Sequence, residues 1–386
     1  MRPETLTCRV GVGLSGASGA VQAAADAARE AREALGGSAV DLAFVFMSAD
    51  HLDDAEDALW TASTELGAAR LLGCVAQGVV GRDRELEDGP GVAIWAASLP
   101  GSWIDTFQAE AIETDDGVAV AGIPGLEDAD LVTLLVDPFS FPAAGFVAEL
   151  DRVPLVGGLA AGTGEPGGQA LFLNGEVVRD GAVGAVLRGV RVATVVSQGC
   201  APVGSDSVIT NAEENVVLEL AGKPAVERLR DELRGMTVEQ QGLAARGGVL
   251  AGLVIDENRS EYRRGDYLVR GLIGADEDSG ALAIGEDVRV GQTLRFHVRD
   301  ARSADEDLRE GLANALNGGS AAGALLFTCN GRGTNMFPAP DHDARAVAEA
   351  LGDDALAGFF CAGEIGPVGG KPFLHGFTAT AALFLS

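Results

Sequence analysis

Three copies of one short glycine pattern constrain the fold of this 386-residue chain more than any other feature. In each copy, two glycines stand five positions apart within an apolar run. The copies are Leu72–Gly78, Val156–Gly162 and Ala357–Gly363. A repeat at this scale indicates that the chain was assembled from copies of one structural unit. Glycines at matching places in predicted strands indicate that neighbouring backbones approach each other closely there.

The surroundings of the glycine pattern are also repeated. A buried strand is predicted before each copy, at Leu42–Met47, Leu131–Val136 and Ala324–Thr328. A helical segment separates that strand from the glycine pattern. A further strand is predicted after each copy, at Gly91–Ser98, Ala170–Asn174 and Phe373–Leu385. The unit is therefore strand-helix-strand-strand. Because many strand pairs form hairpins, we predict a mixed α/β (α+β) protein whose mixed sheets are covered by helices.

Segments outside the repeats complete this prediction. Gly11–Gly16 fits G-x-G-x-x-G before the alanine-rich helix Ala20–Leu35, but the next strand does not end in the acidic residue of a dinucleotide site. We interpret this motif as a strand-to-helix turn. Helices are also predicted at Asn211–Leu220 and Pro224–Leu233. A chain of this length predicts two domains, and the polar stretch 234–246 is the expected boundary or long connection.

Composition excludes several classes of partner. Hydrophobic residues make up 47% of the chain, so the formal charge of -29 belongs to the surface of a folded protein. Such an acidic surface repels phosphate backbones and anionic lipid, and we therefore expect neither nucleic acid nor membrane as a partner. A protein with a basic face remains possible. The five cysteines show no C-x-x-C spacing and no secretory leader is evident, which predicts a reduced cytoplasmic protein.

Six motifs follow one another along the chain. They are Leu72-Gly-Cys, Leu173-Asn-Gly-Glu-Val-Val, Ser197-Gln-Gly-Cys-Ala-Pro-Val-Gly, Arg270-Gly-Leu-Ile-Gly, Cys329-Asn-Gly-Arg-Gly and Cys361-Ala-Gly-Glu-Ile-Gly-Pro. This succession resembles the FIST family, in which a FIST N-terminal domain precedes a FIST C-terminal domain. The resemblance implies the same two domains here, at residues 1–220 and 221–386.

The resemblance also implies a function. FIST proteins are expected to be cytoplasmic sensory modules in signal transduction that bind small ligands such as amino acids. The sequence contains no kinase, cyclase, receiver or F-box segment. Any output is therefore expected to pass to a separate partner protein.

The residues Cys329, Asn330, Gly331 and Arg332 directly follow a predicted buried strand and are the first candidate for a ligand site. Glycine frees backbone N–H groups in such a turn, which makes it a reasonable anion cradle. Arg332 is suited to hold a ligand carboxylate through two parallel hydrogen bonds. We then expect Arg332→Ala to abolish binding and leave the fold intact. The alternative is a tight turn with a solvated arginine.

Glu364 follows the second glycine of the third copy, where the other copies have Val79 and Thr163. Its carboxylate is suited to recognise an ammonium group or to act as a base, and with Arg332 it would match the two charges of an amino acid. The alternative is a partly buried ion pair with an arginine such as Arg332.

Two further interpretations involve cysteine and histidine. Cys329 and Cys361 stand at corresponding ends of neighbouring motifs, as small core residues or as reactive thiols. His375 lies beside a strand and would form a nucleophile-base pair with Cys329 if the two side chains meet. Asp341-His342-Asp343 reads as a helix start with Asp341 as N-cap, in preference to a metal site.

Three classes of function therefore remain open from the sequence. We expect a small-ligand sensor that uses no cofactor or metal. A thiol-dependent enzyme based on Cys329 and His375 is the second possibility, so enzymatic activity is left undecided. A protein-interaction scaffold that binds a basic partner without a small ligand is the third.

Overall fold

The structure, a computed structural model, describes residues 8–115 and 117–386, and these residues form two compact units. Unit 1 comprises the chain up to Val196, together with Leu308–Leu374 and Thr378–Ser386. Unit 2 comprises Ser197–Asp307 and His375–Phe377. The compact units therefore divide the chain at other places than the expected segments 1–220 and 221–386, because the end of the chain returns to unit 1.

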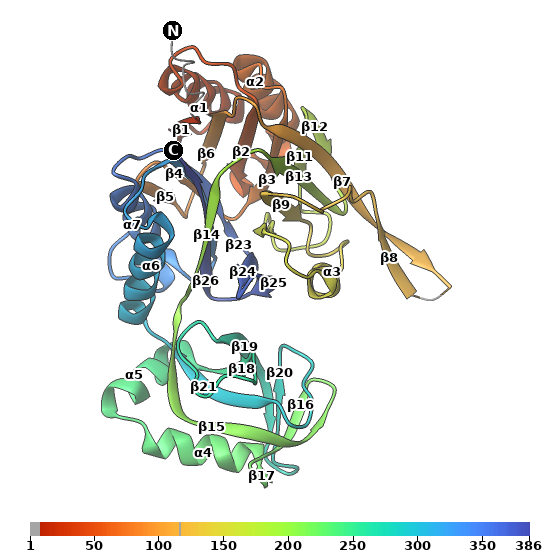
Figure 1. Cartoon of the computed structure of the whole chain (residues 1–386), viewed down its shortest axis with the longest axis vertical. Helices are drawn as coiled ribbons and strands as arrows, with labels where there is room; N and C mark the ends of the chain where they lie inside the picture. Colours follow the sequence, from red (N-terminus) through yellow and green to blue (C-terminus); the bar gives the residue numbers. More distant parts are fainter. Residues whose placement is uncertain (1–7, 116) are drawn as a thin grey trace. The chain divides into compact units, whose positions relative to one another are not determined.

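Unit 1 contains three sheets of closely similar order (Figure 1). Sheet 1 contains, in spatial order, β1 (Arg9–Ser15), β6 (Val92–Ser98), β2 (Leu42–Ser48), β3 (Leu71–Ala76), β11 (Leu171–Leu173) and β12 (Glu176–Val178). Sheet 2 contains β8 (Gly117–Ala121), β7 (Trp103–Thr114), β13 (Ala182–Arg188), β9 (Leu131–Val136), β10 (Leu155–Leu159), β24 (Glu364–Val368) and β25 (Lys371–His375). Sheet 3 contains β14 (Val192–Gln198), β26 (Thr378–Leu385), β22 (Ala321–Cys329), β23 (Leu356–Cys361), β4 (Val79–Gly81) and β5 (Arg84–Leu86).

The same three strands form the centre of each sheet, which confirms the mixed α/β prediction. The first strand of each repeat runs parallel to the glycine strand and antiparallel to the last strand of that repeat. We call β2-β3-β6 repeat 1, β9-β10-β13 repeat 2 and β22-β23-β26 repeat 3. The prediction was wrong for the last strand of repeat 2, which is β13 and not Ala170–Asn174.

The hairpin after each glycine strand joins the sheet of a different repeat. Hairpin β4–β5 of repeat 1 pairs with β23, β11–β12 of repeat 2 pairs with β3, and β24–β25 of repeat 3 pairs with β10. Each repeat thus gives one hairpin and receives another, in a closed cycle. No repeat completes its own sheet.

A shared core holds the three sheets together. Phe46 and Trp95 of sheet 1 contact Phe359 and Phe384 of sheet 3, with ring centroids 5.2 and 4.7 Å apart respectively. Sheet 2 adds aliphatic side chains such as Leu135 to the same cluster. The inner faces of all three sheets are therefore buried against one another.

Helices cover the outer faces of these sheets (Figure 1). Sheet 1 is covered by α1 (Ala20–Ala34) and α2 (Ala55–Leu66), which follows the 3₁₀ turn η1 (Ala49–Asp54). Sheet 2 is covered by α3 (Ala143–Glu149). Sheet 3 is covered by the Leu308–Leu316 part of α6 (Ala301–Leu316) and by α7 (His342–Leu351). Because a helix can pack on only one face of a sheet, the opposite faces are left for the shared core.

The interpretation of Gly11–Gly16 as a turn was wrong. Most of it lies within β1, where a Cβ on Gly11 would stand 2.1 Å from the carbonyl oxygen of Ala31. A Cβ on Gly13 would stand 1.9 Å from the carbonyl oxygen of Ala27. The glycines therefore allow α1 to pack directly on the strand backbone, with only alanine side chains between them.

The first glycine of each copy occupies the same structural position. Gly73, Gly157 and Gly358 lie opposite Val45, Leu134 and Leu326 in the parallel pairings. A Cβ at these glycines would stand 1.9, 1.9 and 1.6 Å from the carbonyl oxygen of that neighbour. The expected close approach of two backbones is therefore present in all three repeats.

Replacement of Gly358 by alanine should lower the free energy of unfolding by about 3 kcal/mol or more, because the added methyl group collides with backbone that cannot rotate away. Gly145 in α3 is the matched control, since a Cβ there meets no atom within 4 Å. Gly145→Ala should be neutral or stabilising by up to about 1 kcal/mol. Urea unfolding of both variants measures the difference, and equal midpoints would contradict the close approach.

Unit 2 is one sheet with two helices on one face. The strand order is β15 (Cys200–Glu213), β21 (Thr293–Arg299), β18 (Val249–Val254), β19 (Tyr267–Asp276), β20 (Ala281–Ile284), β16 (Val216–Leu220) and β17 (Lys223–Pro224). The helices are α4 (Ala225–Gly235), close to the predicted Pro224–Leu233, and α5 (Val238–Gly247).

None of the helices in the described residues combines the length and hydropathy that a bilayer crossing needs.

Two predictions in this region were wrong. Asn211–Leu220 forms the end of β15, a hairpin turn and β16, because Val217 and Leu220 are buried in the core of the sheet while Glu214 turns the chain with a φ of 51°. The stretch 234–246 is not a loose connection. It contains most of α5, whose first turn is closed by reciprocal hydrogen bonds between Thr237 and Gln240.

Candidate functional site

The loop after β22 holds most of the predicted ligand-binding residues. The N–H group of Asn330 donates to the carbonyl oxygen of Cys361 at 2.9 Å, and that of Arg332 to the carbonyl oxygen of Cys329 at 2.8 Å. The N–H group of Gly331 donates to the sulfur of Cys329 at 3.4 Å. All three N–H groups are thus already hydrogen-bonded within the protein.

Arg332 is completely buried and has an acidic partner that the sequence analysis did not identify. Its Nε and Nη2 atoms donate to the two carboxylate oxygens of Asp343 at 2.7 and 2.8 Å. Thr328 Oγ1 and His342 Nδ1 also donate to this carboxylate, at 2.7 and 2.9 Å. Arg332 is therefore neither a solvated arginine nor the ion-pair partner expected for Glu364.

Charge pairing outweighs burial at both partners. Burial disfavours the charged guanidinium, but the negative charge and hydrogen bonds of Asp343 raise the pKa of Arg332 above its usual value. Burial likewise opposes ionisation of Asp343, but Arg332 and the hydrogen bonds lower the pKa of Asp343 well below its usual range. Both groups are charged at neutral pH, and removal of one leaves a buried charge without its partner. Arg332→Ala can therefore no longer be expected to leave the fold intact.

Aromatic rings fix the orientation of the guanidinium. The Cζ atom of Arg332 lies 5.2 Å from the ring centroid of Phe337, a cation–π contact. The ring of Phe337 in turn stacks on His342, with centroids 3.4 Å apart and planes 7° apart. These contacts and Asp343 hold one side of Arg332, whose Nη1 atom has no hydrogen-bond partner among the described residues.

The hairpin from repeat 1 provides a second buried carboxylate. Glu85 Oε1 accepts the N–H groups of Asp343 and Ala344 at 2.8 and 3.0 Å, at the start of α7. Asp341 occupies the predicted N-cap position, but its side chain accepts from the N–H group of Glu85 and does not cap the helix. Burial, assisted by the charge of Asp343, raises the pKa of Glu85 to about 8. The exchanged hairpin therefore contacts the N-cap and the first turn of α7 through Glu85.

Glu364 points into the core and not toward solvent. Its place in the strand pairing corresponds to Val79 and Leu171 in the other hairpins, which are both core residues. The register thus corrects Thr163 as the counterpart in repeat 2. Glu364 Oε2 accepts from the N–H and hydroxyl groups of Thr378 at 3.1 and 2.8 Å. Burial raises the pKa of Glu364 to about 8, against the opposing effects of Thr378, Cys329 and Arg332.

Several unpartnered polar atoms belong to this loop and to the carboxylates described above. Among the described residues, four buried atoms here have no hydrogen-bond partner: Asn330 Oδ1, Arg332 Nη1, Glu364 Oε1 and Glu85 Oε2. Buried polar atoms are normally paired, and an unpaired one costs about 1–3 kcal/mol. The four atoms are one guanidinium donor and three carboxyl or amide oxygens.

His375 is the last residue of β25. It belongs to unit 2, whereas Cys329 belongs to unit 1, so their proposed nucleophile-base pair stays a prediction. Asp341, His342 and Asp343 do not converge on a metal position. No three His, Cys, Asp or Glu side chains within residues 8–115 and 117–386 are arranged to hold a metal ion.

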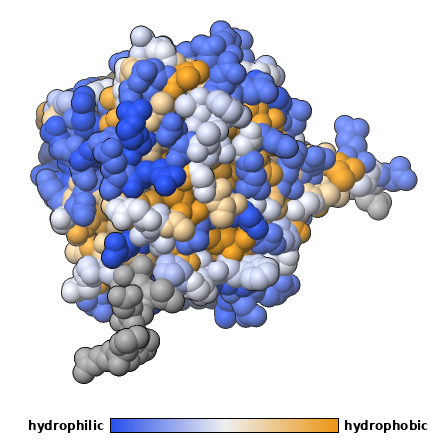
Figure 2. Space-filling view, turned by 90° about the horizontal axis from the view of Figure 1, so that it is seen from above, coloured by the Kyte–Doolittle hydropathy of each residue, from blue (hydrophilic) through white to orange (hydrophobic). Residues whose placement is uncertain are grey.

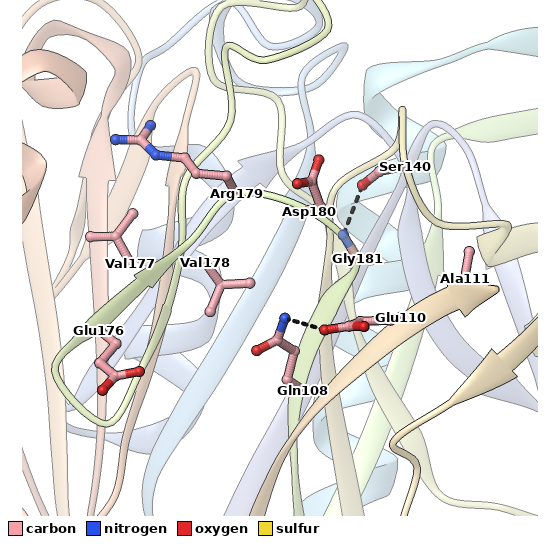
Figure 3. A pocket seen from close by; sticks show the side chains of 10 residues that line it. All are labelled: Gln108, Glu110, Ala111, Ser140, Glu176, Val177, Val178, Arg179, Asp180 and Gly181. Atoms are coloured by element: carbon pink, nitrogen blue, oxygen red, sulfur yellow. Dashed lines mark hydrogen bonds between the residues drawn. The ribbon is translucent and has the colours of Figure 1, made fainter.

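Two open cavities lie elsewhere in unit 1. The larger, of about 570 Å³, is lined by polar residues of β7, β12 and the following loop (Figure 3). Its groups bond to one another: Gln108 donates to Glu110 at 3.0 Å, and the N–H group of Gly181 donates to Ser140 at 2.7 Å. None of the unpartnered buried atoms found in the described residues lines it.

The second cavity, of about 470 Å³, is an apolar groove between the β7–β8 hairpin and α3. The hairpin projects from unit 1 (Figure 1), and some hydrophobic surface lies along the projection in Figure 2. Ile112 and Val118 of this hairpin are exposed. Neither cavity contains a residue of the Arg332 loop.

Sequence reasoning missed Asp343 and Glu85. Asp343 was predicted to lie at the start of a helix. Its separation of 11 positions from Arg332 was the one sequence feature compatible with an ion pair across a turn. Glu85 gave no signal of burial, because it ends the charged run Arg82-Asp-Arg-Glu85. Its contact with Asp343 spans 258 positions in the chain, and no local pattern predicts such a contact.

Comparison with known proteins agrees with this architecture. The FIST N domain model matches residues 41–223 and the FIST C domain model matches residues 225–367. The "Uncharacterized protein Rv0628c" of Mycobacterium tuberculosis is 44% identical over 384 residues, which cover 98% of this chain and 100% of that protein. The "Uncharacterized protein Mb0898c" of Mycobacterium bovis is 42% identical, over 98% of this chain and 99% of that protein. This chain therefore belongs to the FIST family, whose domains are associated with signal transduction.

Proposed function

We propose that this protein is a sensory module that binds a small polar ligand such as an amino acid and passes the signal to a partner protein. The observation that carries the proposal is the group of unpartnered buried atoms around Arg332 and Glu364. The five cysteines form no disulfide, which supports a reducing, cytoplasmic setting.

The chemistry of the loop suits a zwitterion. A guanidinium has two edges that can each hold a carboxylate through two parallel hydrogen bonds. Asp343 takes the Nε–Nη2 edge, so the Nη1 side of Arg332 is the edge that receives a ligand carboxylate. Glu364 Oε1 and Asn330 Oδ1 are acceptors suited to an ammonium group. Cys329 and Gly331 form the adjoining wall.

A route to a partner begins at α7. Asp343 binds Arg332 and also stands at the beginning of this helix. A ligand bound to Arg332 therefore contacts a side chain that is hydrogen-bonded to Asp343 of α7. The outer face of α7 carries exposed charges, Arg345 and Glu349, which a partner can contact.

The affinity for an amino acid should increase with pH between 6 and 8. Glu364 must lose its proton to bind an ammonium group, and its folded pKa is about 8. The affinity should therefore rise roughly tenfold per pH unit from pH 6 and level off above the pKa. The stability of the ligand-free protein should instead decrease with pH. A carboxyl group whose pKa is raised on folding contributes its full stabilisation of the native state below its unfolded pKa. That contribution is lost as the pH rises through the folded pKa of about 8.

Thermal unfolding and calorimetric titration against a panel of amino acids and small carboxylates provide the measurement. Glu364→Gln is the matched variant, because it keeps a hydrogen bond to Thr378 and removes the titration. It should bind with a pH-independent affinity. If no compound shifts the wild-type midpoint at either pH 6 or pH 8, the ligand proposal fails and a protein-interaction scaffold becomes the better explanation.

A further inference from the structure

Two thiols lie side by side where the central strands of repeat 3 end. Cys329 and Cys361 are register partners in the parallel pair β22–β23. The register pair two positions earlier, Phe327 and Phe359, has ring centroids 5.7 Å apart, so side chains at these positions share one face. Neighbouring strands lie about 4.8 Å apart, and a disulfide joins residues whose Cα atoms are about 4.4–6.8 Å apart. A bond between the two sulfurs therefore needs little backbone movement.

The surroundings of the two thiols differ. Cys329 retains 9% of its exposure, its sulfur accepts the N–H group of Gly331 at 3.4 Å, and it lies close enough to the Arg332 guanidinium to interact with it. A partly accessible sulfur that accepts a backbone N–H group beside a guanidinium is a setting shared by reactive cysteines. Cys361 has no exposure, and burial together with the charge of Glu364 raises the pKa of Cys361 well above its usual value.

We propose that Cys329 and Cys361 form a redox-active pair that a hydroperoxide oxidises to a cross-strand disulfide. The sulfur of Cys329 attacks one oxygen of the peroxide, the O–O bond breaks, and the leaving oxygen takes the thiol proton to become an alcohol or water. Cys329 is then a sulfenic acid. The sulfur of Cys361 attacks it, the S–O bond breaks, and the hydroxyl leaves with the thiol proton as water. Two thiols and one hydroperoxide thus give one disulfide, one alcohol and one water.

The asymmetry of the pair assigns the order of these steps. The accessible thiol meets the oxidant first, and the enclosed thiol resolves the sulfenic acid before it oxidises further. Oxidation also removes the Cys329 thiol from its hydrogen bond with Glu364. This inference goes beyond the proposed ligand binding and does not rest on it.

The test uses the full chain treated with hydrogen peroxide, then denatured and alkylated, with peptide mapping under non-reducing conditions. We expect a peptide that joins Cys329 to Cys361 and that dithiothreitol releases. In Cys361→Ser, Cys329 should accumulate as a sulfenic acid that dimedone traps, with at least a tenfold increase over the wild type. Cys74→Ser is the matched control, because Cys74 is equally buried and has a similarly raised pKa. It should leave the Cys329–Cys361 bond unchanged.

Cys361→Ala provides a second resolving-thiol variant if the serine hydroxyl disturbs the core, and its thermal midpoint reports on the fold. A disulfide between Cys329 and Cys74, or oxidation of Cys329 beyond the sulfenic acid while Cys361 remains fully alkylatable, would overturn the proposal. Uniformly slow reaction of all five thiols would do the same.

Discussion

Replacement of Arg332 by alanine is expected to lower the free energy of unfolding by about 3–5 kcal/mol. The substitution removes both hydrogen bonds to Asp343 and leaves that carboxylate charged, buried and close to the carboxyl group of Glu85. It also empties the space above Phe337. Urea unfolding measured by circular dichroism should show a large decrease in the midpoint.

Two controls separate this explanation from a general effect of losing an arginine. Arg345 pairs with Asp341 one turn into α7 and is half exposed, so Arg345→Ala should cost less than about 1 kcal/mol. A double variant, Arg332→Met with Asp343→Leu, removes both charges and should recover much of the lost stability. If Arg332→Ala unfolds at the wild-type midpoint, Asp343 does not hold a buried charge and the site described above is incorrect.

Separation of the chain between the two FIST segments, at residue 224, is expected to abolish folding of both parts. Sheet 3 takes β14, β4 and β5 from the first part, and sheet 2 takes β24 and β25 from the second. Each part alone would expose the inner faces that form the shared core, together with unpaired strand edges. Neither part should show a cooperative thermal transition when expressed alone.

Coexpression of the two parts should restore a complex, because all strand partners are then present. Copurification through a tag on one part, followed by thermal unfolding, measures this. Residues 197–307 are the informative control, since they contain all seven strands and both helices of unit 2. They are expected to fold better than either part. Monomeric, cooperatively unfolding parts 1–224 and 225–386 would instead support the domain division at 220 predicted from the sequence.

The repeat units were accessible to prediction because their signals are local. A buried strand of about six residues has the same apolar composition in any context, and two glycines five apart mark a close approach without knowledge of the neighbour. The first strand and the glycine strand of all three repeats were found in this way. Predictions failed where one sequence pattern is compatible with both a helix and a strand. At Asn211–Leu220, the residues that are buried in the folded protein are those of a strand.

The candidate site was only partly accessible in the same way. Glu364 is unusual for its place in a repeat, and Cys329 and Arg332 stand in a glycine turn after a predicted buried strand, so all three could be singled out from the sequence. Their partners are not. Asp343, Glu85 and Thr378 reach the site from a helix, an exchanged hairpin and the last strand.

Local sequence therefore predicted the elements, their repetition and the unusual residues, since propensity and periodicity act over a few neighbouring positions. The exchange of hairpins, the pairing of Arg332 with Asp343 and the burial of Glu364 depend on which surfaces meet after the chain has collapsed. These tertiary features are determined by the sum of the free energies of core packing, strand pairing and desolvation over the whole molecule. Such a balance joins residues more than 250 positions apart, as Glu85 and Asp343 are.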